Sequence, residues 1–273
     1  GAAAKRDATL TKPAGSLGRL EEIAVWVSGW QGSHPPRLEN PQVTIFAGNH
    51  GVCKKGVSAF PPEVTVQMVA NFEAGGAAIN QLAELAGARF SVYPLDLEQP
   101  TADVTEVAAL TTEEYLAALN AGWEAVEENT DTLVVGEMGI GNTTIAALLC
   151  AALYGGKGED WAGPGTGVSP DGVSHKAMII NQAVEKHADI LADPVLILQH
   201  LGGRELAAMA GAILAARHQN IPVILDGFVT CAAAAVLQKF NPAALDHCIA
   251  GHVSAEPGHI RLLQHLGKEP LLN

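Results

Sequence analysis

The feature that most constrains this chain is a repeated alternation of short apolar runs, small loops and helical patterns. The apolar runs occupy residues 43–47, 90–97, 132–135, 221–225 and 248–250, and most of them lead directly into a glycine or an aspartate. Helical patterns cover residues 16–30, 62–86, 113–127, 143–153, 174–191, 204–219 and 228–240. Because continuous apolar runs of this length indicate strands that are buried on both faces, the alternation predicts an α/β fold with a doubly wound parallel sheet.

The two ends of the chain depart from this alternation. Residues 1–32 precede the first apolar run, and residues 256–273 follow the last one with a helical pattern. We expect the two ends to pack together as a small helical lobe beside a main domain at residues 33–255. Ligands of such sheets bind beyond the carboxyl ends of the strands, so the loops that follow the apolar runs form the candidate binding site.

Charge and cysteine content exclude several classes of protein. The sequence has 16 Lys and Arg residues against 29 Asp and Glu residues, a formal net charge of −13. Such a surface repels nucleic acids and anionic lipids, so we expect neither a nucleic acid nor a membrane as a partner. Cys53, Cys150, Cys231 and Cys248 lie far apart and form no C-x-x-C pair. This spacing favours a reduced, cytoplasmic protein over a disulfide scaffold or a zinc ribbon.

The strongest local signal is the loop GEMGIGNTT at residues 136–144, between an apolar run and a helical pattern. Glycines let backbone amides approach an anion, and the N-terminal end of the next helix offers unpaired N–H groups. The spacing from Gly136 to Gly141 resembles a Walker P-loop, but Asn142 stands where the lysine belongs, and no G-x-G-x-x-G is present. The loop therefore favours a single phosphate over a nucleoside triphosphate or NAD. The alternative is a tight turn whose glycines serve packing alone.

Four polar residues are further candidates. Glu137 would oppose a phosphate unless it faces a cationic or N–H-bearing part of the substrate; its alternative role is to cap its own loop. Lys176 is expected in the first turn of a helix, where the dipole disfavours a cation, so it indicates an anionic partner unless it is a solvated surface lysine. His50 and Asp226 each lie just after an apolar run.

The segment HVSAEPGH at residues 252–259 begins another predicted helix. Ser254 suits either an N-cap or a phosphate donor. His252, Glu256 and His259 could be drawn as a metal site, but their spacing matches no standard ligand motif, and we expect no metal. A serine hydrolase is also disfavoured, because the sequence has no G-x-S-x-G motif.

Seven stretches together resemble one family over nearly the whole chain. They are KPAGSLGRLEE, AGNHGVCKKG, VSAFPPEVTVQM, GGAAIN, GEMGIGNTT, LDGF and HVSAEPGH. Their order and spacing resemble those of the nicotinate-nucleotide:dimethylbenzimidazole phosphoribosyltransferases of cobalamin synthesis, the CobT family. The resemblance implies a homodimer with a three-layer Rossmann-like, nucleotide-binding domain, a small lobe built from both chain ends, and no cofactor. The implied reaction moves phosphoribose from nicotinate mononucleotide to 5,6-dimethylbenzimidazole, with inversion at the anomeric carbon, and yields α-ribazole 5′-phosphate and nicotinate.

The resemblance also implies roles for individual residues. Glu137 would face the substrates as a catalytic residue. The phosphate and the ribose would be bound by Gly139, Gly141, Asn142, Thr143, Lys176, Asp226, Ser254 and Ala255. The base would be bound by Ser58, Pro61, Gln67, Met68 and His50.

The presumed general base of the family belongs to a segment that resembles R-L-G-E-G-(S/T)-G-A and follows the PLL motif, which is found here at residues 270–272. We expect that glutamate beyond Asn273. Residues 1–273 without it are expected to be inactive or nearly so.

Two other functions stay open at this point. One is a catalytically silent nucleotide-binding or sensor module that uses the same loop. The other is a related glycosyl-transferring enzyme, although the acidic diphosphate-binding fingerprint of ordinary phosphoribosyltransferases is absent. A sensor would bind nicotinate mononucleotide without ever turning it over, even in a chain extended past Asn273.

Overall fold

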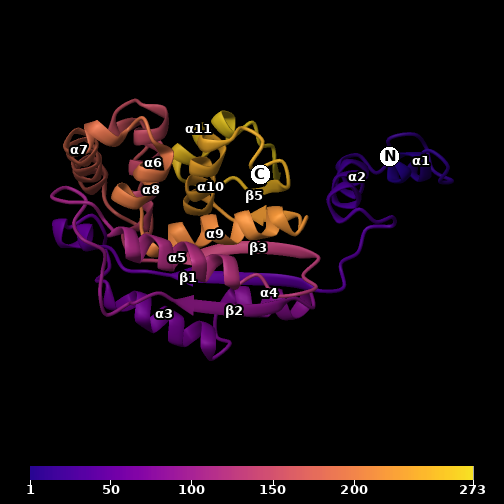
Figure 1. Cartoon of the computed structure of the whole chain (residues 1–273), viewed down its shortest axis with the longest axis horizontal. Helices are drawn as coiled ribbons and strands as arrows, with labels where there is room; N and C mark the ends of the chain where they lie inside the picture. The colour runs from indigo at the N-terminus through magenta and orange to yellow at the C-terminus, as the bar shows by residue number, and fades with distance from the viewer. Residues whose placement is uncertain (273) are drawn as a thin grey trace.

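Six parallel strands form one sheet in the computed structural model, which describes residues 1–272 (Figure 1). The strands are β1 (Pro41–Ala47), β2 (Arg89–Pro94), β3 (Thr132–Met138), β4 (Val223–Leu225), β5 (Cys248–His252) and β6 (Pro270–Leu272). They lie in the order β2-β1-β3-β4-β5-β6, and every neighbouring pair is parallel. The α/β class and the parallel sheet are confirmed, and each of the five predicted runs overlaps one strand, from β1 to β5.

Helices cover both faces of this sheet. The α-helices of the described residues are α1 (Ala2–Asp7), α2 (Arg19–Gln31), α3 (Glu63–Glu73), α4 (Ala78–Leu85), α5 (Thr112–Glu124), α6 (Asn142–Tyr154), α7 (Pro170–Lys186), α8 (Pro194–Leu201), α9 (Arg204–His218), α10 (Phe228–Phe240) and α11 (Pro257–Leu266). In Figure 1, α3 and α4 lie on one side of the sheet, and α5, α9 and α10 lie on the other. The result is the three-layer arrangement expected of a doubly wound sheet.

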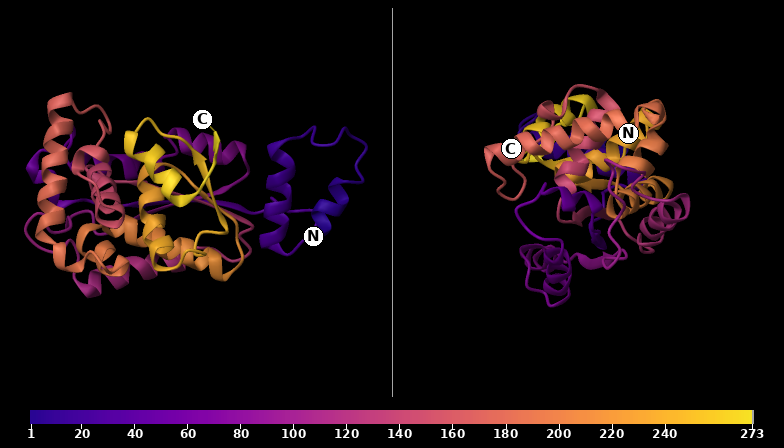
Figure 2. Two further views of the ribbon diagram at one scale, coloured as in Figure 1. Left: turned by 90° about the horizontal axis from the view of Figure 1, so that it is seen from above. Right: turned by 90° about the vertical axis from the view of Figure 1, so that its left-hand side faces the viewer.

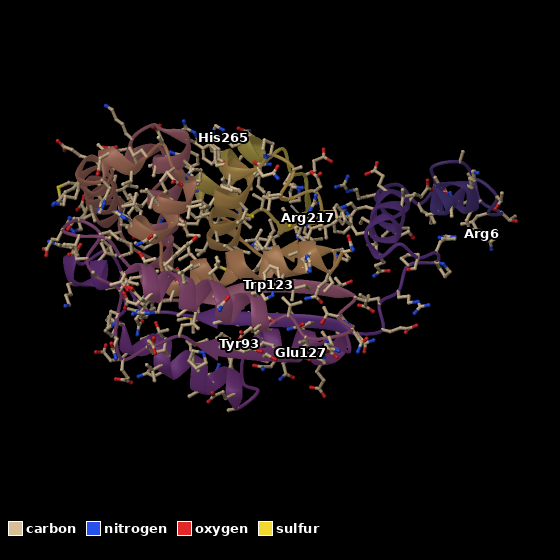
Figure 3. The ribbon with its side chains drawn as sticks, viewed as in Figure 1. Arg6, Tyr93, Trp123, Glu127, Arg217 and His265 are labelled. Carbon is tan, nitrogen blue, oxygen red and sulfur yellow. The ribbon has the colours of Figure 1, made fainter. Side chains whose placement is uncertain are left out.

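The core explains why the strand sequences are continuously apolar. All seven residues of β1 are buried. Val43 and Ile45 pack toward α3 and α4 in a small cluster, whereas Phe46 belongs to the large core beneath α9 and α10. Because successive side chains of a strand point to opposite faces, a strand that is covered on both sides needs apolar residues at both odd and even positions. Tyr93 of β2, labelled in Figure 3, stacks on Phe46 with 5.6 Å between the ring centroids.

Two predicted helices differ most clearly from the structure. The pattern at residues 62–86 is two helices, α3 and α4, because Gly75 takes a φ of 75° and ends the first. The helix predicted at residues 174–191 begins earlier, at Pro170, where the Ser169 side chain accepts a hydrogen bond from the amide of Gly172. A capping box begins α5: Thr111 Oγ1 accepts a hydrogen bond from the amide of Glu114, and the Glu114 carboxylate accepts one from the amide of Thr111.

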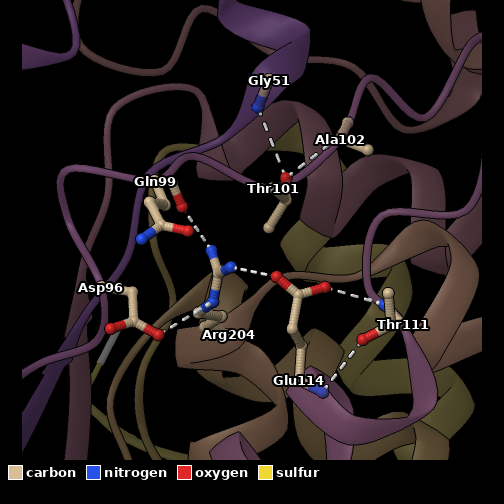
Figure 4. Close-up of polar contacts among 8 residues, drawn as sticks. All are labelled: Gly51, Asp96, Gln99, Thr101, Ala102, Thr111, Glu114 and Arg204. Carbon is tan, nitrogen blue, oxygen red and sulfur yellow. Dashed lines mark hydrogen bonds and ion pairs between the residues drawn. The ribbon is translucent and has the colours of Figure 1, made fainter.

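A cluster of polar contacts around Arg204 fixes the first turn of α9 (Figure 4). Its guanidinium is nearly buried, donates to the backbone oxygen of Gln99 at 2.6 Å, and pairs with the carboxylate of Glu114 at the start of α5. Asp96 lies 3.8 Å from the same guanidinium. These contacts join the loop after β2 to the first turns of α5 and α9.

The N-terminal segment extends away from the sheet, past the amino ends of the strands (Figure 2). It contacts the rest of the chain through α2: the Trp30 ring lies 4.6 Å from the guanidinium carbon of Arg217, a residue labelled in Figure 3. The C-terminal residues instead lie against the sheet, where α11 packs on α10 and β6 pairs with β5. The chain ends approach each other where Arg19 lies 3.4 Å from Glu269. A shared small lobe stays a prediction.

Two further expectations concern the chain as a whole. Cys53, Cys150, Cys231 and Cys248 are free thiols, as predicted. Among the helices of residues 1–272, none combines the length and the apolar character needed to cross a membrane.

Candidate active site

A pocket of about 230 Å³ lies beyond the carboxyl end of β3. It brings together the glycine-rich loop, the segment after the 3-10 helix η1 (Gly51–Lys55), the loop before α7, and α7 itself. The predicted residues that line it are Ser58, Glu137, Gly139, Gly141, Asn142, Thr143 and Lys176. Residues from four separate parts of the sequence thus meet at one strand end, which is where a parallel sheet places its ligands.

The glycine-rich loop is held from outside the pocket. The amide of Ile140 donates to Thr65 Oγ1 of α3 at 3.1 Å, and Cys53 Sγ donates to the carbonyl oxygen of Ile140 at 3.0 Å. Gly141 takes a φ of 87°, and a Cβ there would collide with Cys53 Sγ, so this position requires glycine. Within residues 1–272, no side chain caps the N-terminal end of α6. The amides of Asn142 and Thr144 donate to the carbonyl oxygens of Gly139 and Gly141. The positive end of the α6 dipole nevertheless lies at the pocket, where it suits an anion.

Lys176 brings a cation to this pocket. Its side chain is buried, and Nζ donates to Thr143 Oγ1 at 3.1 Å and to the carbonyl oxygen of Gly163 at 3.2 Å. Burial lowers the pKa of Lys176, while the nearby Glu256 opposes that shift. Because α7 begins at Pro170, Lys176 does not lie in the first turn and the dipole argument was wrong for it. The ammonium nevertheless lies beside the first turn of α6.

Glu137 is the acidic group of the pocket. It stands near the end of β3, and its carboxylate accepts a hydrogen bond from the side-chain amide of Asn142. Burial raises the pKa of Glu137 to about 8, and the negative charges of Glu205 and Asp226 add to this effect. A carboxyl with such a pKa can hold or accept a proton near neutral pH, so Glu137 is suited to acid–base chemistry.

The loop before α7 contributes Thr166 and Val168 to the pocket. Glu256 holds this loop in place, because its carboxylate accepts a hydrogen bond from the amide of Gly165 at 2.7 Å. Sequence reasoning considered Glu256 only as a metal ligand. Its contact with a loop some ninety positions earlier has no local signal.

Glu205 is the second residue that sequence reasoning missed. It is fully buried in the first turn of α9, and its Oε1 lies 2.6 Å from Nε2 of His50. His50, expected to bind the base, is therefore buried behind the pocket and does not line it. An acidic residue in the first turn of a helix is an ordinary partner of the dipole, so no local pattern distinguishes Glu205 from other such residues.

The remaining predicted residues lie outside the pocket. Asp226 follows β4, and 58% of its side chain is exposed. Ser254 follows β5, where its amide donates to Nδ1 of His259 at 3.0 Å and its hydroxyl contacts the same nitrogen at 2.9 Å. Ala255, next to it, is exposed.

Three of the residues predicted to bind the base also lie outside this pocket. Pro61 and Gln67 are exposed before and on α3, and Met68 packs partly into the cluster beneath that helix. Of the group predicted to bind the base, Ser58 lines the pocket.

The imidazole of His259 is an internal structural group. Its Nδ1 accepts a hydrogen bond from the Ser254 amide, and its Nε2 lies 3.4 Å from Cys231 Sγ. Burial lowers the pKa of His259 to about 4. Within residues 1–272, no three His, Cys, Asp or Glu side chains converge as a metal ion would require.

Known proteins of the same kind match this chain over its whole length. A phosphoribosyltransferase family model matches residues 1–273. A nicotinate-nucleotide–dimethylbenzimidazole phosphoribosyltransferase of Cereibacter sphaeroides is 60% identical over 271 residues, which cover 99% of this chain and 80% of that protein. The protein of the same name from Jannaschia sp. is 60% identical over 270 residues, with coverage of 99% and 80%.

Solved structures agree with the sequence comparisons. The crystal structure of the nicotinate-nucleotide–dimethylbenzimidazole phosphoribosyltransferase of Thermus thermophilus matches with a TM-score of 0.91 and 39% identity, covering 99% of this chain and 86% of that one. A structure of CobT from the same organism gives a TM-score of 0.88 and 40% identity, with the same coverage. The family resemblance of the seven stretches is thereby confirmed. The chain belongs to the nicotinate-nucleotide–dimethylbenzimidazole phosphoribosyltransferase family.

Proposed function

We propose that this protein transfers phosphoribose from nicotinate mononucleotide to 5,6-dimethylbenzimidazole, with α-ribazole 5′-phosphate and nicotinate as products. The names of its relatives support this reaction. The observation that carries the proposal is the meeting of three features in one pocket: the uncapped start of α6, the buried ammonium of Lys176, and the carboxyl of Glu137.

The phosphate would bind where α6 begins. The backbone amide of Thr143, the positive end of the α6 dipole and the ammonium of Lys176 would neutralise its charge. Asp226, Ser254 and Ala255, beyond β4 and β5, would contact the sugar or the phosphate from the neighbouring strand ends.

The base slot would adjoin this phosphate site. Its boundary would be formed by Ser58 and by the segment that carries Pro61, Gln67 and Met68, with His50 behind it.

The chemistry needs no covalent intermediate. A lone pair of one benzimidazole nitrogen attacks C1′ of the ribose, while the C1′–N bond to nicotinate breaks and its electron pair passes to the pyridinium nitrogen. The leaving ring becomes neutral at that nitrogen and needs little acid assistance. Attack from the opposite face inverts the anomeric carbon, so holding the two rings on opposite faces of the sugar supplies much of the rate.

One proton must leave the other benzimidazole nitrogen. A carboxylate within reach can accept it, an effect worth about a hundred- to ten-thousand-fold in rate. Glu137 is the carboxyl of the pocket, and its raised pKa makes it a stronger base than an ordinary carboxylate. We propose that it acts together with the family glutamate expected beyond Asn273.

We also propose that the protein works in the cytoplasm as a homodimer. Exposed apolar side chains on α3 and α4 support an interface: Val66, Leu82 and Leu85 are 41%, 60% and 85% exposed. Light scattering after size-exclusion chromatography tests the dimer, and a monomeric mass would refute it.

The decisive experiment combines binding and turnover. Calorimetry measures the binding of nicotinate mononucleotide to the chain, and chromatography with mass detection measures the formation of α-ribazole 5′-phosphate by a chain extended past Asn273. We expect binding by both chains and product from the extended one. Binding without any product in the extended chain would instead support a sensor, and absence of binding would refute the phosphate site.

A further inference from the structure

A fully buried acid–imidazole pair lies directly behind the pocket. The side chains of Glu205 and His50 are both 0% exposed, with 2.6 Å between Oε1 and Nε2. Among the described residues, Nδ1 of His50 and Oε2 of Glu205 have no hydrogen-bond partner. A protonated imidazole would leave a buried N–H unpaired, whereas a neutral one that donates through Nε2 leaves only an acceptor unpaired. Glu205 lies in the first turn of α9, where the helix dipole stabilises a negative charge.

Three glycines from separate segments surround this pair. A Cβ at Gly48 would collide with Oε2 of Glu205, and one at Gly203 would lie 2.9 Å from the same oxygen. A Cβ at Gly139 would lie 2.7 Å from the carbonyl oxygen of Gly48 and 3.2 Å from Oε1 of Glu205. The Glu205 carboxylate is therefore enclosed by the backbone after β1, the backbone after β3 and the start of α9. This packing leaves no room for a side chain at Gly48, Gly139 or Gly203.

Gly139 connects this pair to the reacting groups. It lines the pocket, and a Cβ added to it would lie 3.2 Å from Oε1 of Glu205. The Cβ position at Gly139 also lies 3.3 Å from Nδ2 of Asn142, which is the atom that donates to the carboxylate of Glu137. Gly139 thus adjoins both Glu205 and the side-chain amide that donates to Glu137.

We propose that Glu205, paired with His50, is a positioning residue that holds the Gly139 loop and places a second buried negative charge behind Glu137. This inference rests on the proposed function, since it gives Glu205 its effect through Glu137. Two carboxyl groups in one poorly hydrated region resist simultaneous ionisation. Glu205 then makes Glu137 a better proton acceptor and favours the positive charge that develops on the ribose in the transition state.

Other groups around Glu137 must be considered beside Glu205. Asp226 also raises the pKa of Glu137, and Asn142 lowers it through its hydrogen bond. The charged or titratable groups that line or adjoin the pocket from the remaining elements are Lys176 on α7, Cys53 on η1 and His50 after β1. Lys176 and Asp226 remain in place in a variant altered only at Glu205, so that variant isolates the charge of Glu205.

The test is the titration of Glu137 in the ligand-free protein. Carbon-13 NMR follows glutamate side-chain carboxyl signals with pH, and the signal absent from Glu137→Gln belongs to Glu137. In Glu205→Gln, which keeps the size of the side chain and an acceptor for His50, we expect the midpoint to fall by about one pH unit. Glu256→Gln is the matched control, because it removes another buried carboxylate that does not act on Glu137. We expect the Glu137 midpoint to stay unchanged there.

An unchanged midpoint in Glu205→Gln would overturn the proposal. If that variant does not fold, His50→Gln is used instead. It retains the charge of Glu205, so the titration midpoint of Glu137 should stay high, and a lower Glu137 midpoint in this variant would also overturn the proposal. In the extended chain, Glu205→Gln should lower kcat about tenfold and leave KM for nicotinate mononucleotide within about twofold. Because the titration needs no turnover, failure of the proposed function and failure of this inference remain distinguishable.

Discussion

Replacing Lys176 by alanine removes the one ammonium that lines the described pocket. The side chain is 2% exposed and already oriented by Thr143 and Gly163, so little entropy is lost when it binds a phosphate. A charge-assisted hydrogen bond of this kind contributes about 2 kcal/mol. We therefore expect Lys176→Ala to weaken the binding of nicotinate mononucleotide about thirtyfold, while binding of the benzimidazole changes much less.

Calorimetry with each ligand separately measures both effects. Lys176→Met, which retains most of the buried aliphatic volume, separates the loss of charge from the loss of packing. Lys186→Ala is the matched control, since Lys186 is an exposed lysine on the same helix and should leave both affinities unchanged. Equal losses for the mononucleotide and the benzimidazole would remove Lys176 from the phosphate site and refute the reasoning.

Three further predictions concern the catalytic carboxyl, the loop glycine and the buried histidines. Glu137→Gln in the extended chain should lower kcat, measured by product formation, about a hundredfold, and should leave the thermal unfolding midpoint unchanged. Turnover at the wild-type rate would show that Glu137 is structural and not catalytic. Gly141→Ala should lower the free energy of unfolding in urea by about 3 kcal/mol, since it adds a collision with Cys53 to the cost of a positive φ. The control is Gly155→Ala at the other end of α6, where φ is 74° and no described neighbour lies within 4 Å; it should lower the free energy of unfolding by only about 1 kcal/mol. Equal losses in the two variants would contradict the packing argument. Burial lowers the pKa values of His247 and His259 to about 4, so between about pH 6.5 and 4 the unfolded chain binds protons that the folded chain does not. The free energy of unfolding should therefore be retained above pH 6.5 and fall as the pH approaches 4. In thermal unfolding scans, His259→Gln should reduce the dependence of stability on pH.

Much of the fold was determined by patterns that act over a few residues. A strand covered on both faces needs apolar residues at both odd and even positions, and the five apolar runs meet that requirement. The loop at residues 136–144 could likewise be predicted from the sequence, because glycine at a turn and an uncapped helix start are local features. Errors arose where a local signal was weak: Gly75 divided one predicted helix, and Ser169 started another before its expected residue.

Only the tertiary structure decided which side chains meet. The strand order places β1 beside β3 although they are far apart in the sequence, so the loops after these strands close together on Glu205 from α9. Lys176 reaches the pocket from the second turn of α7, Glu256 holds a distant loop, and Ser254 contacts His259. Each of these contacts depends on how helices pack after the chain has crossed the sheet, and no pattern within a few residues encodes it. The sequence by itself therefore determined the layers and the phosphate loop, while packing decided the charges that surround Glu137.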